Sequence, residues 1–552
     1  MPVWPGRMSE EERRQLRASG AWGAKTIAHH ARALAEREPE RLLIVDGERR
    51  VTAAAHLEEA ERLAQALVGR GLRPGDVVSY ILPNWYESCV LNLAAALAGL
   101  VLNPLLPIYR ERELQFMLGD SGSRALFAPA TFRNVDYIDL ISRIRSSLPE
   151  LRDLIVVRGS PDAGPTYEEL VQDSGRRPLP EVDPSSPKLL IYTSGTTGRP
   201  KGVVHSHETI LADVRSLEQH WKVTSQDVFF VPSPVTHIGG SLYAHEFPWF
   251  SGTPAVLLDI WSGKEAVRLI DRFGCTISAG ATPFLKDLVE SAAAARTRLT
   301  TLRLFICGGA AVPPELIRKA MKAFPNCVAC RAYGSTEVPT VTSGTPAVRD
   351  EFLCAETDGI ACGTEIRIVD PESERELEPG LEGEVIVRGP EMFLGYLRPE
   401  DNEGTFTRSG FFRTGDIGRL DQAGRLTITG RKKDLIIRLG ENISPKEIED
   451  LLGTHPAIAD VAVVAVPSER TGEAVCACVV LRPGESLTLP DIASFMIRQG
   501  TARQKIPEAR LVLDDLPRTA TGKVRKDLLR EMAARSATRV DREKPDSRDR
   551  KG

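Results

Sequence analysis

The sequence predicts a chain of mixed α/β and α+β class, with a large N-terminal domain of parallel and mixed sheets flanked by helices and a small C-terminal α+β domain. Its 552 residues are too many for one ordinary domain. Short apolar strands alternate with helical patterns between residues 24 and 127, which is typical of a parallel sheet covered by helices. Three basic residues between Gly430 and an apolar strand indicate a domain boundary.

The elements follow from local patterns. Residues 42–51 form a hairpin that turns on Asp46 and Gly47, and Ser206 can cap a helix that reaches Leu217. The other expected helices are 24–37, 55–70, 85–100, 111–118, 446–452 and a last one ending near Arg535. The other expected strands are 77–82, 125–127, 189–191, 304–307, 328–333, 461–466 and 474–481.

Composition excludes several classes of partner. The chain has 71 basic and 75 acidic residues, a balance that favours neither a nucleic-acid surface nor a polybasic membrane patch. The longest apolar stretch, 90–106, contains Asn92, Gly99 and Pro104 and therefore predicts a buried helix running into a strand, with no transmembrane segment. Residues 1–17 lack the apolar core of an export signal, so we expect a cytoplasmic chain.

Nine cysteines are consistent with a reducing compartment. Cys327 and Cys330 form one C-x-x-C pair, but no second pair or histidine pair stands at zinc spacing. Both flank or enter a predicted strand, and free cysteine is commonly a small buried hydrophobe. We therefore expect these thiols to serve packing.

A glycine-rich segment, YTSGTTGRPKG at 192–202, follows the apolar strand at 189–191. Its glycines let the backbone turn its N–H groups toward an anion, and its hydroxyls and Lys201 add donors and positive charge. It is not a Walker A loop, because Pro200 stands where that pattern needs its second Gly, before Lys201. The composition indicates a phosphate-binding loop, with a glycine-rich surface turn as the alternative.

A second motif, RAYGSTE at 331–337, lies about 140 residues further along. The ring of Tyr333 offers a stacking face for adenine, and Thr336 offers a hydroxyl. Glu337 offers a carboxylate for Mg²⁺ bound to phosphate oxygens. Other motifs are VPSPVTHIGGS at 231–241, LFICGGAA at 304–311, FRTGD at 412–416, GRKKD at 430–434 and PRTATGK at 517–523.

This ordered set, which covers roughly residues 25–535, closely resembles the adenylate-forming superfamily of acyl-CoA synthetases, aryl-CoA ligases, luciferases and peptide-synthetase adenylation domains. The resemblance implies a nucleotide site made of Thr193, Ser194, Gly195, Thr196, Thr197, Gly198, Lys201, Gly309, Tyr333, Gly334, Thr336, Asp416 and Arg431. It implies Lys523, Glu337 and His237 as catalytic residues, Glu337 also as the metal ligand, and Lys433 as a hinge. The implied substrate pocket is His237, Ile238, Gly239, Gly240 and Gly308.

Several of these residues also have plain structural interpretations. By itself, His237 is a satisfied loop histidine and Lys523 a solvated surface lysine; only the motif context favours function. His205 and His207 have no evident partner and are interpreted as structural. Arg331 stands where many relatives have Gln, and its consequence cannot be deduced from the sequence.

The resemblance also implies a domain organisation. Residues 1–24 are an N-terminal extension, 25–430 the adenylation domain, 431–536 a mobile C-terminal domain and 537–552 a charged, disordered tail. The expected cofactors are ATP, Mg²⁺ and coenzyme A, with a carboxylic acid as the small-molecule partner. We expect a monomer or homodimer with no nucleic-acid partner.

The implied function is an AMP-forming acyl-CoA ligase, which makes an acyl-AMP and then transfers the acyl group to coenzyme A. The segment 235–241 contains no aspartate that could hold an amino group, and no carrier domain is appended. The motifs look most like cyclohexanecarboxylate-CoA ligase and the short- and medium-chain branch, so the expected acid is apolar, alicyclic or medium-chain, or else aromatic or steroid-derived. The alternatives are a ligase that loads a carrier protein, a luciferase-like oxygenase and a non-catalytic nucleotide-binding homologue.

Overall fold

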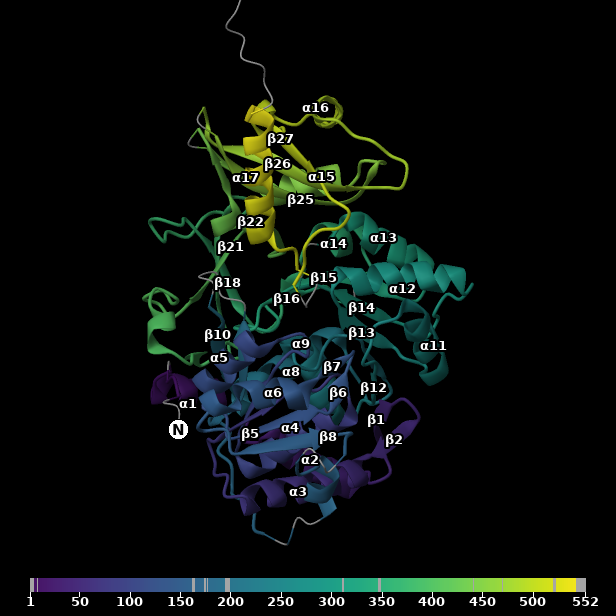
Figure 1. Ribbon diagram of the computed structural model, residues 1–552, viewed down its shortest axis with the longest axis vertical. Coiled ribbons are helices and arrows are strands. Elements are labelled where there is room, and N and C mark those ends of the chain that lie inside the picture. The colour runs from purple at the N-terminus through teal and green to yellow at the C-terminus, as the bar shows by residue number, and fades with distance from the viewer. Residues whose placement is uncertain are drawn as a thin grey trace, which may run out of the picture. The chain divides into compact units, whose positions relative to one another are not determined.

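The computed structural model describes residues 4–6, 8–160, 164–172, 175, 177–193, 199–309, 312–345, 349–439, 441–468, 470–519 and 523–542. They form two compact units (Figure 1). The first comprises Met1–Gly308, Glu315–Ile366 and Val387–Phe412, and the second Gly309–Pro314, Arg367–Ile386 and Arg413–Gly552. The predicted class, a large α/β unit and a smaller α+β unit, is confirmed.

A nine-stranded sheet forms one half of the first unit. Its interior strands are parallel, and antiparallel strands close both edges. In sheet order they are β17 (Ile360–Ala361), β16 (Thr342–Ser343), β15 (Val328–Tyr333), β14 (Leu304–Cys307), β13 (Ile277–Gly280), β11 (Phe229–Val231), β12 (Ala255–Leu257), β1 (Leu42–Asp46) and β2 (Arg49–Thr52). The β1–β2 pair is the hairpin predicted at 42–51.

A seven-stranded sheet forms the other half. In order it contains β20 (Gly395–Tyr396), β10 (Lys201–Ser206), β9 (Pro187–Thr193), β4 (Val101–Pro104), β3 (Val77–Tyr80), β5 (Ala125–Pro129) and β8 (Asp153–Val157). The antiparallel pair β9–β10 carries the glycine-rich segment between its strands, and β20 pairs with β10 although it follows nearly 200 residues later. A short hairpin, β6 (Thr131–Phe132) and β7 (Val135–Asp136), stands apart from both sheets.

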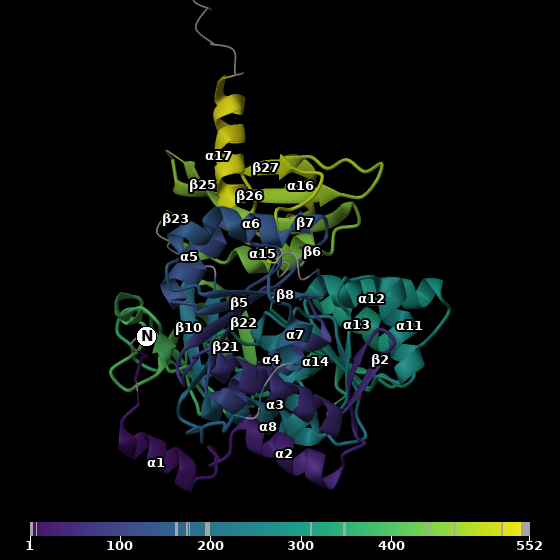
Figure 2. The same cartoon turned by 60° about the horizontal axis from the view of Figure 1, so that its bottom comes forward.

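Helices cover and separate these sheets (Figures 1 and 2). They are α1 (Glu10–Ala18), α2 (Ile27–Arg37), α3 (Ala53–Gly69), α4 (Tyr86–Ala98), α5 (Glu111–Ser121), α6 (Tyr137–Ile144), α7 (Tyr167–Gln172), α8 (His207–Trp221), α9 (Ile238–Ser241), α10 (Phe247–Ser251), α11 (Gly263–Phe273), α12 (Thr282–Ala294), α13 (Pro314–Ala323) and α14 (Glu351–Glu356). Every residue of α4 is buried, and α4 contacts both β4 and β1, so it lies between the two sheets. This explains why its sequence is apolar on all sides.

The predicted buried helix running into a strand is therefore confirmed as α4 followed by β4. Among the described residues, no helix combines the length and the apolar character needed to cross a bilayer. The predicted cap is also confirmed, since the Ser206 side chain accepts a hydrogen bond from the Thr209 N–H at the start of α8.

The second unit contains two small sheets and three helices. Its four-stranded sheet is β18 (Glu365–Val369), β19 (Gly383–Arg388), β21 (Phe412–Leu420) and β22 (Leu426–Arg431). Its five-stranded sheet is β24 (Glu441–Ile443), β23 (Ile436–Arg438), β26 (Gly472–Leu481), β25 (Ile458–Ser468) and β27 (Ala509–Val512), which pairs with β26. The helices are α15 (Pro445–Leu452), α16 (Leu489–Arg498) and α17 (Lys526–Arg542).

Apolar side chains from both faces of the β25–β26 pair build two cores. Val463, Val475 and Ala477 belong to one core with residues of α15 and α16, while Cys476 and Val464 belong to the other with residues of α17. Figure 2 shows α17 against β25 and β26. The two faces explain why the predicted strands 461–466 and 474–481 are apolar at successive positions.

The predicted C-terminal domain begins at residue 431. The second compact unit also includes β21 and β22, because they form one sheet with β18 and β19. The last helix, predicted to end near Arg535, extends to Arg542, since no glycine or proline interrupts it. Residues 537–542 of the predicted tail are therefore helical, and residues 543–552 lie outside the described residues.

All nine cysteines are free and buried, as the packing interpretation predicts. Burial raises the pKa of Cys327 to about 12 and that of Cys330 well above its ordinary value. These thiols are therefore protonated near neutral pH and are poor nucleophiles.

Two buried carboxyl groups stand out in the first unit. Asp213 of α8 is fully buried, and burial raises its pKa to about 7; its nearest donor is the Thr340 hydroxyl, 3.5 Å from Oδ2. Both carboxyl oxygens of Glu391 are buried without a hydrogen-bond partner among the described residues. Burial and the charge of Asp213 raise the pKa of Glu391 well above its ordinary value. The interior of the unit thus favours the neutral form of each.

Asp213→Asn should stabilise the protein relative to the parent, and this gain should be larger at pH 8 than at pH 5. The folded state raises the pKa of Asp213 from about 4 to about 7, so the parent loses unfolding free energy as pH rises through this window. The variant removes this loss, with a gain of roughly 2–4 kcal/mol at the upper end. Thermal melts from pH 5 to 8.5 measure it. Asp139→Asn, at an exposed position, is the control; equal pH dependence of Asp213→Asn and parent would contradict the prediction.

Candidate active site

The ends of the glycine-rich segment meet across the β9–β10 pair. Thr193, the last residue of β9, is the register partner of Lys201, the first residue of β10, and the Thr193 hydroxyl lies 3.5 Å from the Lys201 carbonyl oxygen. Residues 194–198 of the predicted site (Ser194, Gly195, Thr196, Thr197 and Gly198) lie outside the described residues. The two described ends are therefore paired on adjacent antiparallel strands.

The basic side chains of Arg199 and Lys201 contact β20 and the short helical turn Pro399–Asn402 that follows it. The Lys201 ammonium lies 4.7 Å from the centre of the Tyr396 ring and 4.0 Å from Oδ1 of Asp401. Arg199 donates to the same carboxylate at 3.2 Å. The Tyr396 ring and the Asp401 carboxylate both stabilise positive charge, so they hold the cationic side chains of Lys201 and Arg199 in place.

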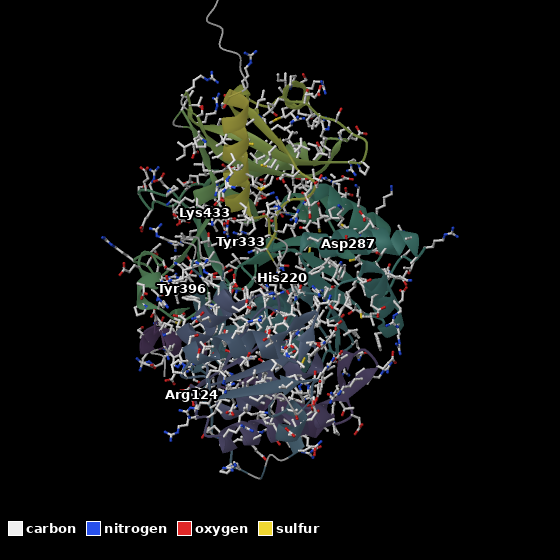
Figure 3. The ribbon with its side chains drawn as sticks, viewed as in Figure 1. Arg124, His220, Asp287, Tyr333, Tyr396 and Lys433 are labelled. Carbon is white, nitrogen blue, oxygen red and sulfur yellow. The ribbon has the colours of Figure 1, made fainter. Side chains whose placement is uncertain are left out.

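The motif 331–337 forms the end of β15 and a tight turn. A Cβ atom on Gly334 would lie 2.1 Å from the Pro339 carbonyl oxygen, so only glycine fits. The Ser335 N–H donates to the Val338 carbonyl oxygen at 2.9 Å and closes the turn. Tyr333 thus stands at the end of a strand, where Figure 3 labels it, and Glu337 lies in the turn.

The side chain of His205, in β10, contacts the backbone of this turn. Its Nε2 lies 2.7 Å from the Thr336 carbonyl oxygen, and its Nδ1 lies 3.0 Å from the Thr209 hydroxyl. Burial lowers the pKa of His205 to about 4, so the ring is neutral at pH 7 and Nε2 must carry the proton to donate to that carbonyl. His205, interpreted as structural, therefore has a partner: the backbone carbonyl of Thr336, a predicted nucleotide-binding residue.

Glu337 and Lys201 are joined through one tyrosine. The Tyr396 hydroxyl donates to Oε1 of Glu337 at 2.7 Å, and its ring receives the Lys201 ammonium. Burial and the charge of Glu337 raise the pKa of Tyr396, so the phenol remains a donor. Tyr396 is not among the predicted site residues; the one signal in the sequence is the Gly395-Tyr396 pair after an apolar β pattern at 383–388. Figure 3 labels this side chain.

The residues present suit the predicted Mg²⁺ ion. Mg²⁺ prefers oxygen ligands and is commonly held by one or two carboxylates together with substrate phosphates and water. Glu337 is only partly buried, and the tyrosine bond engages Oε1. In the described part of the chain, no group of three or more His, Cys, Asp or Glu side chains is arranged to hold a metal by itself.

The predicted acid pocket begins where β11 ends. The His237 N–H donates to the Pro234 carbonyl oxygen at 2.9 Å, and a Cβ on Gly240 would lie 2.1 Å from that oxygen, so the turn requires glycine. Above Gly239 there is room: an added Cβ would lie 3.7 Å from the Tyr243 ring and 3.9 Å from Nδ1 of His237. Ile238 is buried, and Gly308 packs against the Ala332 carbonyl oxygen at the end of β14.

Arg331, whose role the sequence left open, forms a buried ion pair. Its guanidinium donates to Oδ1 of Asp358 at 2.7 and 3.0 Å and to the Ala355 carbonyl oxygen at 3.0 Å. The side chains of Arg331 and Asp358 are 4% and 8% exposed. The arginine therefore ties β15 to the segment that follows α14.

The second unit brings together two other predicted nucleotide-binding residues. Asp416 of β21 and Arg431 of β22 are register partners, and Arg431 Nε donates to Oδ1 of Asp416 at 2.7 Å. Asp416 is buried and follows Gly415, whose φ of +68° favours glycine. Its carboxylate thus lies directly beside the arginine on the neighbouring strand.

Three further predicted residues belong to this unit. Lys433 is at the surface, and partial burial with the nearby charge of Arg431 lowers its pKa. Lys523 is exposed; its N–H donates to the Thr519 hydroxyl at 3.1 Å, and its carbonyl accepts from the Thr519 N–H at 2.7 Å. Gly309 has a φ of +80°, in the region that favours glycine.

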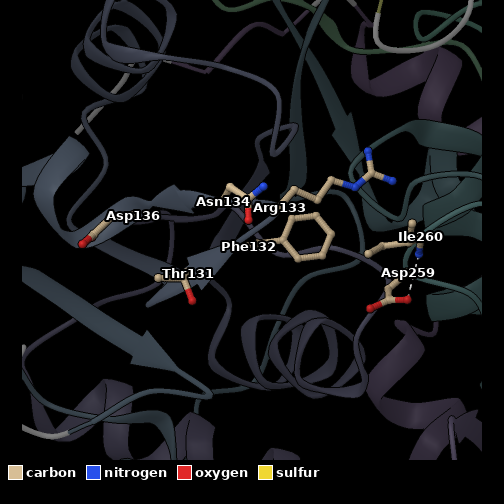
Figure 4. A pocket seen from close by; sticks show the side chains of 7 residues that line it. All are labelled: Thr131, Phe132, Arg133, Asn134, Asp136, Asp259 and Ile260. Carbon is tan, nitrogen blue, oxygen red and sulfur yellow. Dashed lines mark hydrogen bonds between the residues drawn. The ribbon is translucent and has the colours of Figure 1, made fainter.

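An open depression of about 590 Å³ lies elsewhere on the first unit (Figure 4). It is lined by Thr131, Phe132, Arg133, Asn134, Asp136, Asp259 and Ile260. None of these is a predicted site residue, and most carry polar side chains. The depression is therefore distinct from the residues assigned to nucleotide and acid.

Comparisons with known proteins agree with this arrangement. Residues 31–397 match the model of the family "AMP-binding enzyme", and residues 447–523 match "AMP-binding enzyme C-terminal domain". The chain belongs to the AMP-binding enzyme family. The predicted class, an adenylate-forming enzyme of the acyl-CoA synthetase type, is confirmed.

Individual relatives of this AMP-binding enzyme align along nearly its whole length. It is 36% identical over 539 residues to a medium-chain fatty-acid–CoA ligase of Escherichia coli (strain K12), covering 96% of this chain and 94% of that one. It is 31% identical to a mitochondrial medium-chain acyl-CoA ligase of Danio rerio, covering 92% and 88%. ATP-bound MatB from Rhodopseudomonas palustris has a TM-score of 0.83 at 30% identity, covering 92% and 99%.

Arg331→Gln should destabilise the enzyme, because it leaves the Asp358 carboxylate buried without its partner. The expected loss is about 3 kcal/mol of unfolding free energy or more, seen as a lower midpoint in calorimetry. Arg331→Gln/Asp358→Asn should recover much of it. Glu365→Gln breaks the exposed pair with Arg388 and should change less than about 1 kcal/mol. An unchanged midpoint in Arg331→Gln would contradict the structural role.

Proposed function

We propose that this enzyme is an AMP-forming acyl-CoA ligase whose substrate is an apolar carboxylic acid of medium chain length or alicyclic shape. It uses ATP and Mg²⁺ and transfers the acyl group to coenzyme A in the cytoplasm, as a monomer or homodimer. The observation that carries the proposal is the full-length similarity, at 36% and 31% identity, to ligases named for medium-chain acids.

The chemistry of the acid pocket supports the same substrate class. Ile238, Gly239, Gly240 and Gly308 bring neither charge nor a hydrogen-bonding side chain. The space above Gly239 is bounded by the Tyr243 ring and the His237 imidazole. An apolar acyl group loses little on entering such a space, whereas a second charge on the substrate would be left without a partner. His237 then lies beside the carboxylate end.

The first half-reaction makes the carboxylate into an acyl donor. One carboxylate oxygen forms a bond to the α-phosphorus of ATP, the bond from that phosphorus to the bridging oxygen breaks, and pyrophosphate leaves. Lys523 stabilises the negative charge between carboxylate and α-phosphate. Mg²⁺, when bound through Glu337, would supply positive charge to the phosphate oxygens. The loop 193–201 holds the β- and γ-phosphates through its N–H groups, its hydroxyls and Lys201.

The adenine and the ribose are assigned to other predicted residues. Tyr333 stacks on adenine beside Gly309 and Gly334, and Thr336 adds a hydrogen bond. Asp416 accepts from the ribose hydroxyls, and Arg431, its ion-pair partner, contacts the ribose as well. A carboxylate that already accepts from an arginine keeps a fixed orientation for these bonds.

The second half-reaction transfers the acyl group to a thiol. The coenzyme A sulfur attacks the acyl carbon, the bond from that carbon to the AMP oxygen breaks, and AMP leaves. We propose that residues 431–536 turn about Lys433 between the two steps, which removes Lys523 and admits the thiol. The nine buried cysteines take no part, because neither step needs a protein nucleophile.

A panel of acids assayed for AMP and acyl-CoA tests the substrate proposal. The panel contains acetate, hexanoate, octanoate, decanoate, palmitate, cyclohexanecarboxylate, benzoate, 4-coumarate and a bile acid. We expect kcat/KM to be highest for hexanoate to decanoate or for cyclohexanecarboxylate. We expect at least a tenfold preference over acetate, since each buried methylene contributes about 0.8 kcal/mol. Acyl-AMP without acyl-CoA would instead favour a carrier-protein acceptor, and AMP formation only with aromatic acids would contradict the substrate class.

Lys523→Ala should slow acyl-AMP formation by roughly 10²–10³-fold, as expected when one preorganised charge-stabilising contact is removed. ATP–pyrophosphate exchange measures this step, and thioester formation from supplied acyl-AMP should change much less. Lys505→Ala, which removes a surface lysine paired with Glu447 in the same unit, is the matched control. Normal exchange in Lys523→Ala would exclude the catalytic role.

A further inference from the structure

Tyr396 occupies a fixed position between two of the groups just assigned to the phosphates. It is 6% exposed, and it lies in β20, where it is the register partner of Val203 in β10. Its hydroxyl donates to Oε1 of Glu337 at 2.7 Å, and the Lys201 ammonium lies 4.7 Å from its ring centre.

Its backbone is held as firmly as its side chain. Asn402 Oδ1 accepts from the Tyr396 N–H at 2.8 Å, and Asn402 Nδ2 donates to the Tyr396 carbonyl oxygen at 2.9 Å. The Phe393 ring meets the Tyr396 ring edge-on at 5.0 Å between centres. The Tyr396 phenol is therefore held in place, and its hydroxyl sets the orientation of the Glu337 carboxylate.

We infer that Tyr396 is a positioning residue for the metal-binding carboxylate: it holds Oε1 of Glu337 and so presents Oε2 to a divalent cation carried by the nucleotide phosphates. The inference rests on the proposed function for the identity of that cation. Carboxylates that ligate metals are themselves hydrogen-bonded, and loss of such a partner typically lowers metal affinity 10–100-fold. The ring contact with Lys201 gives the phosphate loop and the carboxylate a common support.

The arrangement predicts two separable contributions from one side chain. The hydroxyl acts on Glu337 and therefore on the metal, whereas the ring acts on Lys201 and therefore on the phosphates directly. Tyr396→Phe removes the first and keeps the second, because the ring, its packing on Phe393 and its contact with Lys201 all remain. Tyr396→Leu removes both.

Calorimetric titration of the full-length chain with ATP, in Mg²⁺ and separately in EDTA, is the test. In Tyr396→Phe we expect ATP affinity in Mg²⁺ to fall about tenfold, while affinity in EDTA changes less than twofold. In Tyr396→Leu both should fall. In the Glu337→Gln background, Tyr396→Phe should have no further effect, because the carboxylate through which it acts is gone.

A purely structural role gives a different pattern. Tyr396→Phe would then weaken ATP binding equally with and without Mg²⁺, or leave both unchanged, or weaken Mg·ATP binding just as much in Glu337→Gln; each result would overturn the inference. If Tyr396→Phe does not fold, Asn402→Ala replaces it, since Asn402 holds the Tyr396 backbone without touching Glu337 or Lys201. The same selective loss in Mg²⁺ is expected there, and an equal loss in EDTA overturns the inference.

These measurements need no carboxylic acid and no coenzyme A. A chain that turned over no acid, yet lost Mg·ATP affinity selectively in Tyr396→Phe, would refute the proposed function and support the positioning role. A chain that made acyl-CoA, but whose ATP affinity in Mg²⁺ did not change in Tyr396→Phe, would support the proposed function and refute the positioning role.

Discussion

The antiparallel pairing of β10 with both β9 and β20 is the constraint on which the phosphate end of the site depends. It joins a hairpin tip to a strand nearly 200 residues later in the chain. Because the register is fixed, Lys201 and Tyr396 lie on neighbouring strands, and the tyrosine reaches Glu337 in the turn after β15. This ladder of backbone hydrogen bonds therefore places Lys201 beside Tyr396, and the tyrosine hydroxyl links the ladder to Glu337.

Backbone geometry also prepares the other parts of the site. Gly240 and Gly334 each stand where a side chain would collide with a carbonyl oxygen, so the two turns are set by steric exclusion before any ligand binds. In the second unit, the β21–β22 register places Asp416 opposite Arg431 in the same way. Polar groups held by strands and tight turns lose little freedom on binding a nucleotide, which favours a preorganised site.

Local patterns in the sequence were enough to predict much of the fold. The 42–51 hairpin follows from Asp46-Gly47, the start of α8 from Ser206, and the buried helix α4 from a stretch that is apolar on every face. The motifs likewise identified the family. What could not be predicted depends on contacts between residues far apart in the chain.

His205 meets Thr336 across 131 positions, and Tyr396 meets Glu337 across 59, so neither partnership has a local signature. Arg331 shows the same limit, because a charged residue in a strand pattern does not reveal that Asp358 neutralises it. The division into units also required the structure, since β21 and β22 join the C-terminal unit through pairing with β18 and β19. The motifs predicted the chemistry of the site. Strand register and side-chain packing decide which other residues support the predicted ones.

The most direct test follows the carboxylate oxygen itself. Octanoate labelled with ¹⁸O in both carboxylate positions is converted to octanoyl-CoA in the presence of ATP and Mg²⁺, and the nucleotide product is analysed by mass spectrometry. Attack of the carboxylate on the α-phosphorus predicts AMP that carries one ¹⁸O atom, because that oxygen stays on phosphorus when the thiol takes the acyl carbon. Label in inorganic phosphate with ADP as the nucleotide product, or AMP without ¹⁸O, would contradict an acyl-adenylate intermediate.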